Sequence, residues 1–234
     1  MHARTLPDEP ALIDAAVEVV SLAARDAIER RGRFTFAVSG GSTPWRLLQR
    51  LAAEPIGWRQ THVFQVDERV APTGHAERNL TRLLKSLDRV ANEATVHPID
   101  VEDADLERAA ARYAAKLRSV CGAGATLDLV HLGLGEDGHT ASLAPGDAVL
   151  EITDCDVAVT AEYRGRRRVT LTYPALNRAR GRLWLVAGAA KREVLGKLLR
   201  GDTAIPGGRI ERRDTTLLTD QDVATVAGPL ASGG

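Results

Sequence analysis

Residues 127–143 read Leu127-Asp128-Leu129-Val130-His131-Leu132-Gly133-Leu134-Gly135-Glu136-Asp137-Gly138-His139-Thr140-Ala141-Ser142-Leu143. The segment begins as an apolar run of strand length, passes two glycines, and then places Glu136, Asp137 and His139 within four positions. Open α/β sheets carry their chemistry just beyond the carboxyl ends of their strands. We therefore expect an α/β sheet with a functional site at this turn, and His139 is the first candidate for a catalytic residue.

The overall composition limits the partners that the chain can have. Of its 234 residues, 31 are Lys or Arg and 31 are Asp or Glu, so the formal net charge is +0. A neutral chain has no bulk attraction to nucleic acid or to a membrane surface, and no apolar run approaches the roughly 18 residues of a membrane span. Cys121 and Cys155 stand far apart in no metal-ligand pattern, and no secretory signal opens the chain. We therefore expect a reduced, cytoplasmic setting.

Hydrophobic periodicity alternates between helix and strand along the chain. Helices are predicted at residues 11–31, 45–51, 80–87, 103–120 and 192–199. Strands are predicted at residues 34–38, 62–66, 128–132, 156–160, 168–172, 183–187 and 215–218. This alternation is typical of a single α/β domain with a mostly parallel, Rossmann-like sheet flanked by helices on both faces. We expect the domain to span residues 1–228 and residues 229–234 to form a disordered tail.

A glycine-rich turn, Ser39-Gly40-Gly41-Ser42-Thr43-Pro44, follows the predicted strand 34–38. We expect Thr43 to cap the next helix and Pro44 to occupy its first position. The glycines allow a ligand to approach the backbone, and the hydroxyls together with the N–H groups at the helix start favour an anion, most often phosphate. An ordinary strand-to-helix turn is the alternative. The turn matches neither a Walker sequence nor a Gly-x-Ser-x-Gly elbow.

Two further strand ends carry charged groups. Asp67-Glu68-Arg69 follows strand 62–66 and forms either part of a site or a solvated rim. Lys191 stands at the start of a predicted helix, where the helix dipole disfavours a cation and a bound anion would stabilise it. The arginines at 164 and 166–168 form either a local anion site or a solvated loop. His131 lies within a predicted strand, and we interpret it as a hydrogen-bonded core residue.

The carboxyl ends of parallel strands meet at one edge of a sheet, so we expect the four polar segments to form one composite site. That site would combine a phosphate loop, cations, carboxylates and one histidine. Because the sequence contains no cluster with metal-ligand spacing and no dinucleotide fingerprint, we expect neither a metal nor a cofactor. These residues indicate acid–base chemistry on a small phosphorylated molecule.

Taken together, the motifs resemble those of the 6-phosphogluconolactonase family. They follow in family-like order from about Phe34 to Leu199, and they are the segments 39–44, 67–69, 132–143, 168–172, 176–177 and 188–191. The related glucosamine-6-phosphate isomerases and deaminases share the Gly-Gly loop, the Asp-Glu pair and an Asp-Gly-His segment. Segments 139–143 and 168–172 together favour the lactonase. Ala144 stands where an aromatic residue is usual and Leu80 where Tyr is expected, which affects the shape of the pocket.

The resemblance implies an enzyme of the oxidative pentose phosphate pathway that hydrolyses 6-phospho-D-glucono-1,5-lactone to 6-phospho-D-gluconate. In that reaction His139 would be the general base that activates water, and Asp67 or Glu136 would orient its imidazole. Loop N–H groups or an arginine would stabilise the charge on the carbonyl oxygen. The phosphate would be held by loop residues and cations, namely Ser39, Gly40, Gly41, Ser42, Thr43, Arg69, Arg168 and Lys191.

Two other functions fit part of the pattern. A glucosamine-6-phosphate isomerase or deaminase would use Asp67 as a base near C2 and His139 in ring opening. A non-catalytic sugar-phosphate-binding domain usually accompanies a DNA-binding segment, and no helix-turn-helix or basic arm precedes Phe34. We expect the partner to be a small phosphorylated sugar lactone, with no role for nucleic acid or membrane, and the chain to be a monomer or a small homo-oligomer.

Overall fold

A parallel sheet runs through the computed structural model, which describes residues 1–227. In spatial order its strands are β1 (His2–Thr5), β10 (Thr215–Thr219), β9 (Gly181–Val186), β6 (Leu129–Leu132), β2 (Phe34–Val38), β3 (Thr61–Gln65) and β5 (Thr95–His97). Every neighbouring pair in this sheet is parallel, which confirms the predicted α/β class with a mostly parallel sheet.

The order of the strands reverses between β2 and β6. From β2 the chain moves outward through β3 to β5, and it then returns to β6 on the other side of β2 before continuing to β9 and β10. Val38, the last residue of β2, pairs with His131 of β6. The segments that follow these two strands therefore leave the sheet side by side, at the crevice where doubly wound sheets bind their ligands.

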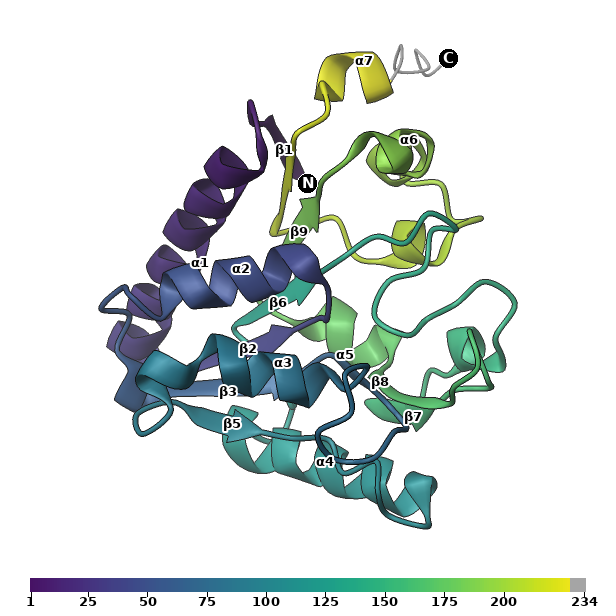
Figure 1. Ribbon diagram of the computed structural model, residues 1–234. Helices are drawn as coiled ribbons and strands as arrows, with labels where there is room; N and C mark the ends of the chain where they lie inside the picture. Colours follow the sequence, from purple (N-terminus) through teal and green to yellow (C-terminus); the bar gives the residue numbers. More distant parts are fainter. Residues whose placement is uncertain (228–234) are drawn as a thin grey trace.

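Helices cover both faces of the sheet, as Figure 1 shows. One face carries α1 (Glu9–Arg31), α2 (Ser42–Leu51) and α3 (Asn79–Ser86). The other face carries α4 (Leu106–Cys121), α5 (Tyr173–Arg178) and α6 (Arg192–Arg200). A short α7 (Val223–Ala227) follows β10.

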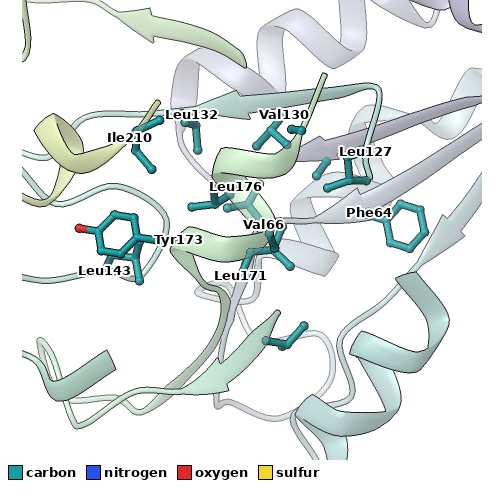
Figure 2. Close-up of a cluster of buried hydrophobic side chains, with 14 of the residues drawn as sticks. Phe64, Val66, Leu127, Val130, Leu132, Leu143, Leu171, Tyr173, Leu176 and Ile210 are labelled. Atoms are coloured by element: carbon teal, nitrogen blue, oxygen red, sulfur yellow. The ribbon is translucent and has the colours of Figure 1, made fainter. Parts of the chain in front are cut away.

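The strands divide their side chains between two cores because successive residues of a strand point to opposite faces. In β2, Phe36 and Val38 pack under α1 and α2, whereas Ala37 lies in the opposite core. Figure 2 shows this opposite core, in which Val130 of β6 and Leu176 of α5 belong to one cluster. Burial on both faces explains why these strands are almost continuously apolar in the sequence.

A second, antiparallel sheet adjoins the first. Its strands in spatial order are β4 (Asp67–Arg69), β8 (Arg168–Leu171) and β7 (Val157–Val159). The predicted strands 156–160 and 168–172 correspond to β7 and β8, but the sequence patterns indicated neither β4 nor the antiparallel pairing. A strand as short and charged as β4 has no apolar alternation, and its conformation depends on pairing with β8, which comes about a hundred residues later. This pairing places Asp67 opposite Thr170 and Arg69 opposite Arg168.

Several short elements were not predicted for the same reason. β1, β5, α5 and α7 each have six residues or fewer, which is too short for a clear period. The predicted tail at 229–234 lies outside the described residues 1–227, and so does residue 228. Among residues 1–227, no helix combines the length and the apolar character that crossing a membrane requires.

Candidate active site

A cleft of about 180 Å³ opens beyond the carboxyl ends of the central strands. It is lined by Ser39, Gly40, Asp67, Arg69, Gly133, Leu134, Gly135, His139, Ala141, Tyr163, Arg164, Arg168 and Lys191. Residues from all four predicted polar segments are among them. Parallel pairing of β9, β6, β2 and β3 brings these segments together, although they are spread over more than 150 positions in the sequence.

The helix after the Gly-Gly loop begins earlier than predicted, which changes the residues that the loop contributes to the cleft. Helix α2 begins at Ser42 with Gly41 as its N-cap, so the prediction that Thr43 is the cap was wrong. The Thr43 hydroxyl instead donates to Oε1 of Glu9 at 3.3 Å, and Thr43 does not line the cleft. Gly41 can take this cap position because its φ of 142° lies in a region that disfavours other residues.

Gly41 and Ser42 line an adjoining cleft of about 300 Å³. Arg69 lines both clefts, and Arg78 and Arg82 line the second. Gly40 marks a close approach of the chain, because a Cβ at this position would lie 2.1 Å from Oδ1 of Asn79. The first turn of α2 thus shares a cleft with Arg69 and Arg82, a combination that favours anions, whereas the charge of Arg78 is paired with Glu68 at 3.3 Å.

Asp67 is buried in the wall of the cleft and held by two polar side chains. Ser142 Oγ donates to its Oδ2 at 2.6 Å, and Asn79 Nδ2 lies 3.3 Å from its Oδ1. Glu68 is fully buried and serves a different purpose, since it accepts the backbone N–H groups of Asn79 and Leu80 at 2.7 and 2.8 Å. These bonds satisfy the start of α3, so Glu68 stabilises the fold and does not line the cleft.

The carboxylate that contacts His139 is Asp137. Its Oδ1 lies 2.5 Å from Nδ1 of His139. We expected Asp67 or Glu136 in this position, and for both residues the prediction was wrong. The carboxylate of Asp67 is held by Ser142, and the side chain of Glu136 is 66% exposed with its nearest cation, Nζ of Lys191, 3.8 Å away.

A tight turn brings Asp137 back onto His139. Gly135 N donates to the carbonyl of His139 at 2.8 Å, and Gly138 N donates to the carbonyl of Gly135 at 3.0 Å. Gly138 adopts a φ of +83°, which reverses the chain between the two partners. A Cβ on Gly135 would lie 1.9 Å from Nδ1 of His139, so only glycine leaves room for the imidazole.

Tyr163 completes this group and was not among the predicted site residues. Its hydroxyl donates to Oδ2 of Asp137 at 2.6 Å. Burial alone would raise the pKa of Asp137, but hydrogen bonds from Tyr163 and His139 hold it below its ordinary value. Burial and the bond to Asp137 raise the pKa of Tyr163. Asp137 is therefore ionised and Tyr163 neutral at physiological pH. A fixed Asx-Gly-His spacing could have indicated Asp137, whereas no sequence signal indicated Tyr163.

Four cationic side chains line the cleft together with His139, and three of them, Arg69, Arg168 and Lys191, are among the predicted site residues. Arg168 is 8% exposed, its Nε has no hydrogen-bond partner among the described residues, and burial lowers its pKa. Arg69 lies opposite it on β4, with a guanidinium nitrogen donating to the carbonyl of Glu77 at 2.9 Å. Lys191 comes from the segment after β9. This arrangement is suited to an anionic ligand.

The arginine cluster at 164–168 divides between two environments. Arg164 and Arg168 line the cleft. Arg166 and Arg167 form ion pairs with Glu77 and Glu107, away from it. Two arginines of the cluster therefore line the cleft, and the other two form ion pairs outside it.

His131 lies in the core as predicted, but the expected hydrogen bond is missing. It is fully buried, and neither ring nitrogen has a partner within residues 1–227. Burial lowers the pKa of His131 to about 3, so its imidazole is neutral in the folded protein. In the same part of the chain, no three His, Cys, Asp or Glu side chains gather in a metal-binding arrangement.

Comparison with known proteins agrees with the resemblance in the motifs. The model of a family described as glucosamine-6-phosphate isomerases/6-phosphogluconolactonase matches residues 7–219. A 6-phosphogluconolactonase of Nostoc sp. is 38% identical over 199 residues, 82% of each chain. One of Synechocystis sp. is 39% identical over 193 residues, 80% of each chain. The structure of 6-phosphogluconolactonase from Trypanosoma cruzi matches with a TM-score of 0.84 at 26% identity, over 98% of this chain and 97% of that one.

Proposed function

The chain belongs to the family of glucosamine-6-phosphate isomerases and 6-phosphogluconolactonases, and we propose that within it the chain hydrolyses 6-phospho-D-glucono-1,5-lactone to 6-phospho-D-gluconate. The reaction is a step of the oxidative pentose phosphate pathway. The observation that carries the proposal is the pairing of His139 with Asp137 in a cleft that also contains Arg69, Arg168 and Lys191.

His139 acts as the general base. Because Asp137 accepts from Nδ1, the lone pair of His139 lies on Nε2, and this nitrogen takes a proton from water as the water oxygen attacks C1 of the lactone. An activated ester needs no covalent nucleophile. The carboxylate of Asp137 stabilises the imidazolium that forms and keeps the ring in one orientation, as in other base–carboxylate pairs.

The tetrahedral intermediate then collapses. The bond between C1 and the ring oxygen breaks, and the imidazolium returns its proton to that oxygen, which becomes the hydroxyl on C5. The new carboxylic acid then loses its own proton to the solvent. The overall reaction consumes the attacking water and releases one proton. Backbone N–H groups of the glycine loops around residues 40 and 133–134 stabilise the negative charge on the carbonyl oxygen, whereas the N–H of Gly135 is already bonded to the carbonyl of His139.

The cations hold the substrate by its phosphate. Arg69, Arg168 and Lys191 line the same cleft as His139, and the first N–H groups of α2 have no carbonyl partner within the helix. Fixing the phosphate at one end places C1 near Nε2 and makes the attack effectively unimolecular. Ser39 and Gly40 complete this wall, and Asp67, held by Ser142, orients a sugar hydroxyl.

A direct assay tests this function against its rivals. The purified chain is given the lactone, and ring opening is followed by proton release above the spontaneous rate. It is given glucosamine 6-phosphate in parallel, and ammonia is measured. We expect accelerated lactone opening without ammonia. Ammonia without lactone opening would identify an isomerase or deaminase, and binding without either reaction would identify a sugar-phosphate-binding domain.

A further inference from the structure

We propose that Tyr163 is a positioning residue for both halves of the site, because its hydroxyl fixes Asp137 behind His139 and its ring holds Arg168 in the cleft. The inference rests on the proposed lactone hydrolysis, and it adds a residue whose two functions can be separated by substitution. Tyr163 lies in neither of the motif segments that surround the histidine and the arginine.

Tyr163 lies at the tip of a tight hairpin that reaches the cleft. Tyr163 N donates to the carbonyl of Arg166 at 3.0 Å, across a two-residue turn. Both turn residues have positive φ, 52° at Arg164 and 78° at Gly165, as the tightest hairpins require. Arg166 ties the tip to the neighbouring chain, donating to the carbonyl of Val70 at 3.2 Å and to Glu77 at 2.6 Å.

The hydroxyl group completes the fixation of Asp137. One carboxylate oxygen of Asp137 lies 2.5 Å from Nδ1 of His139, and the other accepts from Tyr163 at 2.6 Å. A carboxylate bonded at both oxygens cannot rotate away from the imidazole. The Tyr163 ring also packs edge-on against His139, with 5.6 Å between centroids, so it restricts the imidazole itself.

The ring face holds the arginines. The guanidinium carbon of Arg168 lies 4.9 Å from the Tyr163 centroid, and that of Arg164 lies 5.1 Å from it. Among residues 1–227, no carboxylate lies within 4.0 Å of the Arg168 guanidinium, and its Nε has no hydrogen-bond partner. The cation–π contact therefore restrains this buried cation directly, whereas Asp67 attracts it only from beyond ion-pair distance.

The two contacts predict different kinetic effects. The hydrogen bond from the Tyr163 hydroxyl withdraws negative charge from the carboxylate of Asp137. Without that bond, Asp137 stabilises the protonated imidazole of His139 more strongly, and the acid limb of the kcat/KM profile moves to higher pH. It also loosens Asp137, which lowers kcat. The ring acts on Arg168 and hence on the phosphate, so its removal raises KM and weakens inhibition by the product 6-phosphogluconate.

The experiment compares two substitutions at this position. Tyr163→Phe removes the hydroxyl and keeps the ring. We expect kcat to fall about tenfold, the acid limb to move up by about 0.5 pH unit, and KM to stay within about twofold. Tyr163→Leu removes the ring as well, and we expect KM and the product inhibition constant to rise by about a further tenfold.

Tyr173 offers a matched control, because it has the same two features away from the cleft. Its hydroxyl donates to the carbonyl of Pro206 at 3.0 Å, and Arg209 lies over its ring at 4.8 Å. Tyr173→Phe should leave the pH profile and KM unchanged. If Tyr163→Leu does not fold, as judged by circular dichroism, Tyr163→Trp replaces it, since Trp keeps the aromatic face and should keep KM.

Each half of the proposal can fail separately. An unchanged kcat and pH profile in Tyr163→Phe would overturn the role of the hydroxyl. A KM for Tyr163→Leu equal to that of Tyr163→Phe, or a tenfold higher KM for Tyr163→Trp, would overturn the role of the ring. If the unsubstituted enzyme opens no lactone, the proposed function fails first, and this result is distinct from either outcome.

Discussion

Arg69 and Arg168 lie directly opposite each other on the antiparallel strands β4 and β8. Among residues 1–227, no carboxylate lies within 4.0 Å of either guanidinium. Like charges at facing positions of a sheet destabilise it, and here both side chains line the cleft. The fold therefore keeps two cations together with no carboxylate at ion-pair distance in that part of the chain, which is the charge arrangement that the proposed phosphate site requires.

This pair predicts opposite effects on binding and on stability. Arg69→Met should raise KM about tenfold and raise the free energy of unfolding of the free enzyme by about 0.5 kcal/mol, because the repulsion disappears. Inorganic phosphate should raise the melting temperature of the unsubstituted enzyme more than that of the variant. Arg167→Met is the control, since Arg167 pairs with Glu107 outside the cleft. An unchanged KM in Arg69→Met would remove Arg69 from the phosphate site.

His139 is expected to dominate the chemical step. His139→Ala should lower lactone turnover by about 10² or more, measured above the spontaneous hydrolysis rate. The control is His2→Ala, because His2 is exposed at the start of the edge strand β1. Turnover equal to that of the unsubstituted enzyme would rule out His139 as the general base.

Adjacent carboxylates should behave differently. Asp137→Asn keeps the size of the side chain and loses its charge, so we expect kcat to fall by about 10–10². Glu136→Gln should affect kcat far less and act mainly on KM, since Glu136 lies near Lys191. Steady-state kinetics of both variants test this. Equal losses of kcat would mean that Asp137 has no special link to His139.

Two glycines of the same loop provide a steric test. A Cβ at Gly135 would collide with His139, whereas a Cβ at Gly133 would meet no atom within 4 Å among the described residues. Gly135→Ala should therefore lower turnover about 10²-fold, because displacing a catalytic group by about 1 Å has that effect. Gly133→Ala should lower it far less. Circular dichroism checks that both variants fold, and similar activities would contradict the close packing at Gly135.

The buried His131 predicts a pH dependence of stability. Its pKa falls from an ordinary value near 6.5 to about 3 on folding. Between these values the unfolded chain binds the proton that the folded chain excludes, so stability falls as the pH decreases from about 6.5 toward 3. For a fully buried group the slope approaches about 1.4 kcal/mol per pH unit. His97, whose pKa burial lowers to about 4, acts with the same sign.

Urea unfolding at pH 7 and pH 5 measures this effect. His131→Leu should lose less stability between the two values than the unsubstituted protein does, because one protonation site of the unfolded chain is gone. A variant with the same loss would show that other groups dominate the acid sensitivity.

The sequence alone determined the class of the fold and most of the groups in the cleft. Strand and helix periods are local, and the carboxyl ends of parallel strands share an edge. Ser39, Asp67, His139 and Lys191 could therefore be assigned to one site from their positions at the ends of predicted strands. The strongest signal for that prediction was the apolar segment that forms β6 together with the turn that follows it.

Which group contacts which was decided only by the tertiary structure. The partner of His139 is Asp137 because a turn with positive φ at Gly138 folds the loop back, while Ser142 binds Asp67 from another segment. Tyr163 reaches the site on the connection between β7 and β8, and β8 in turn pairs with β4, which lies about a hundred residues earlier in the sequence. Periodicity records which face of an element is buried, but hydrogen bonds depend on distances between side chains from separate elements, and these distances exist only once the elements have packed.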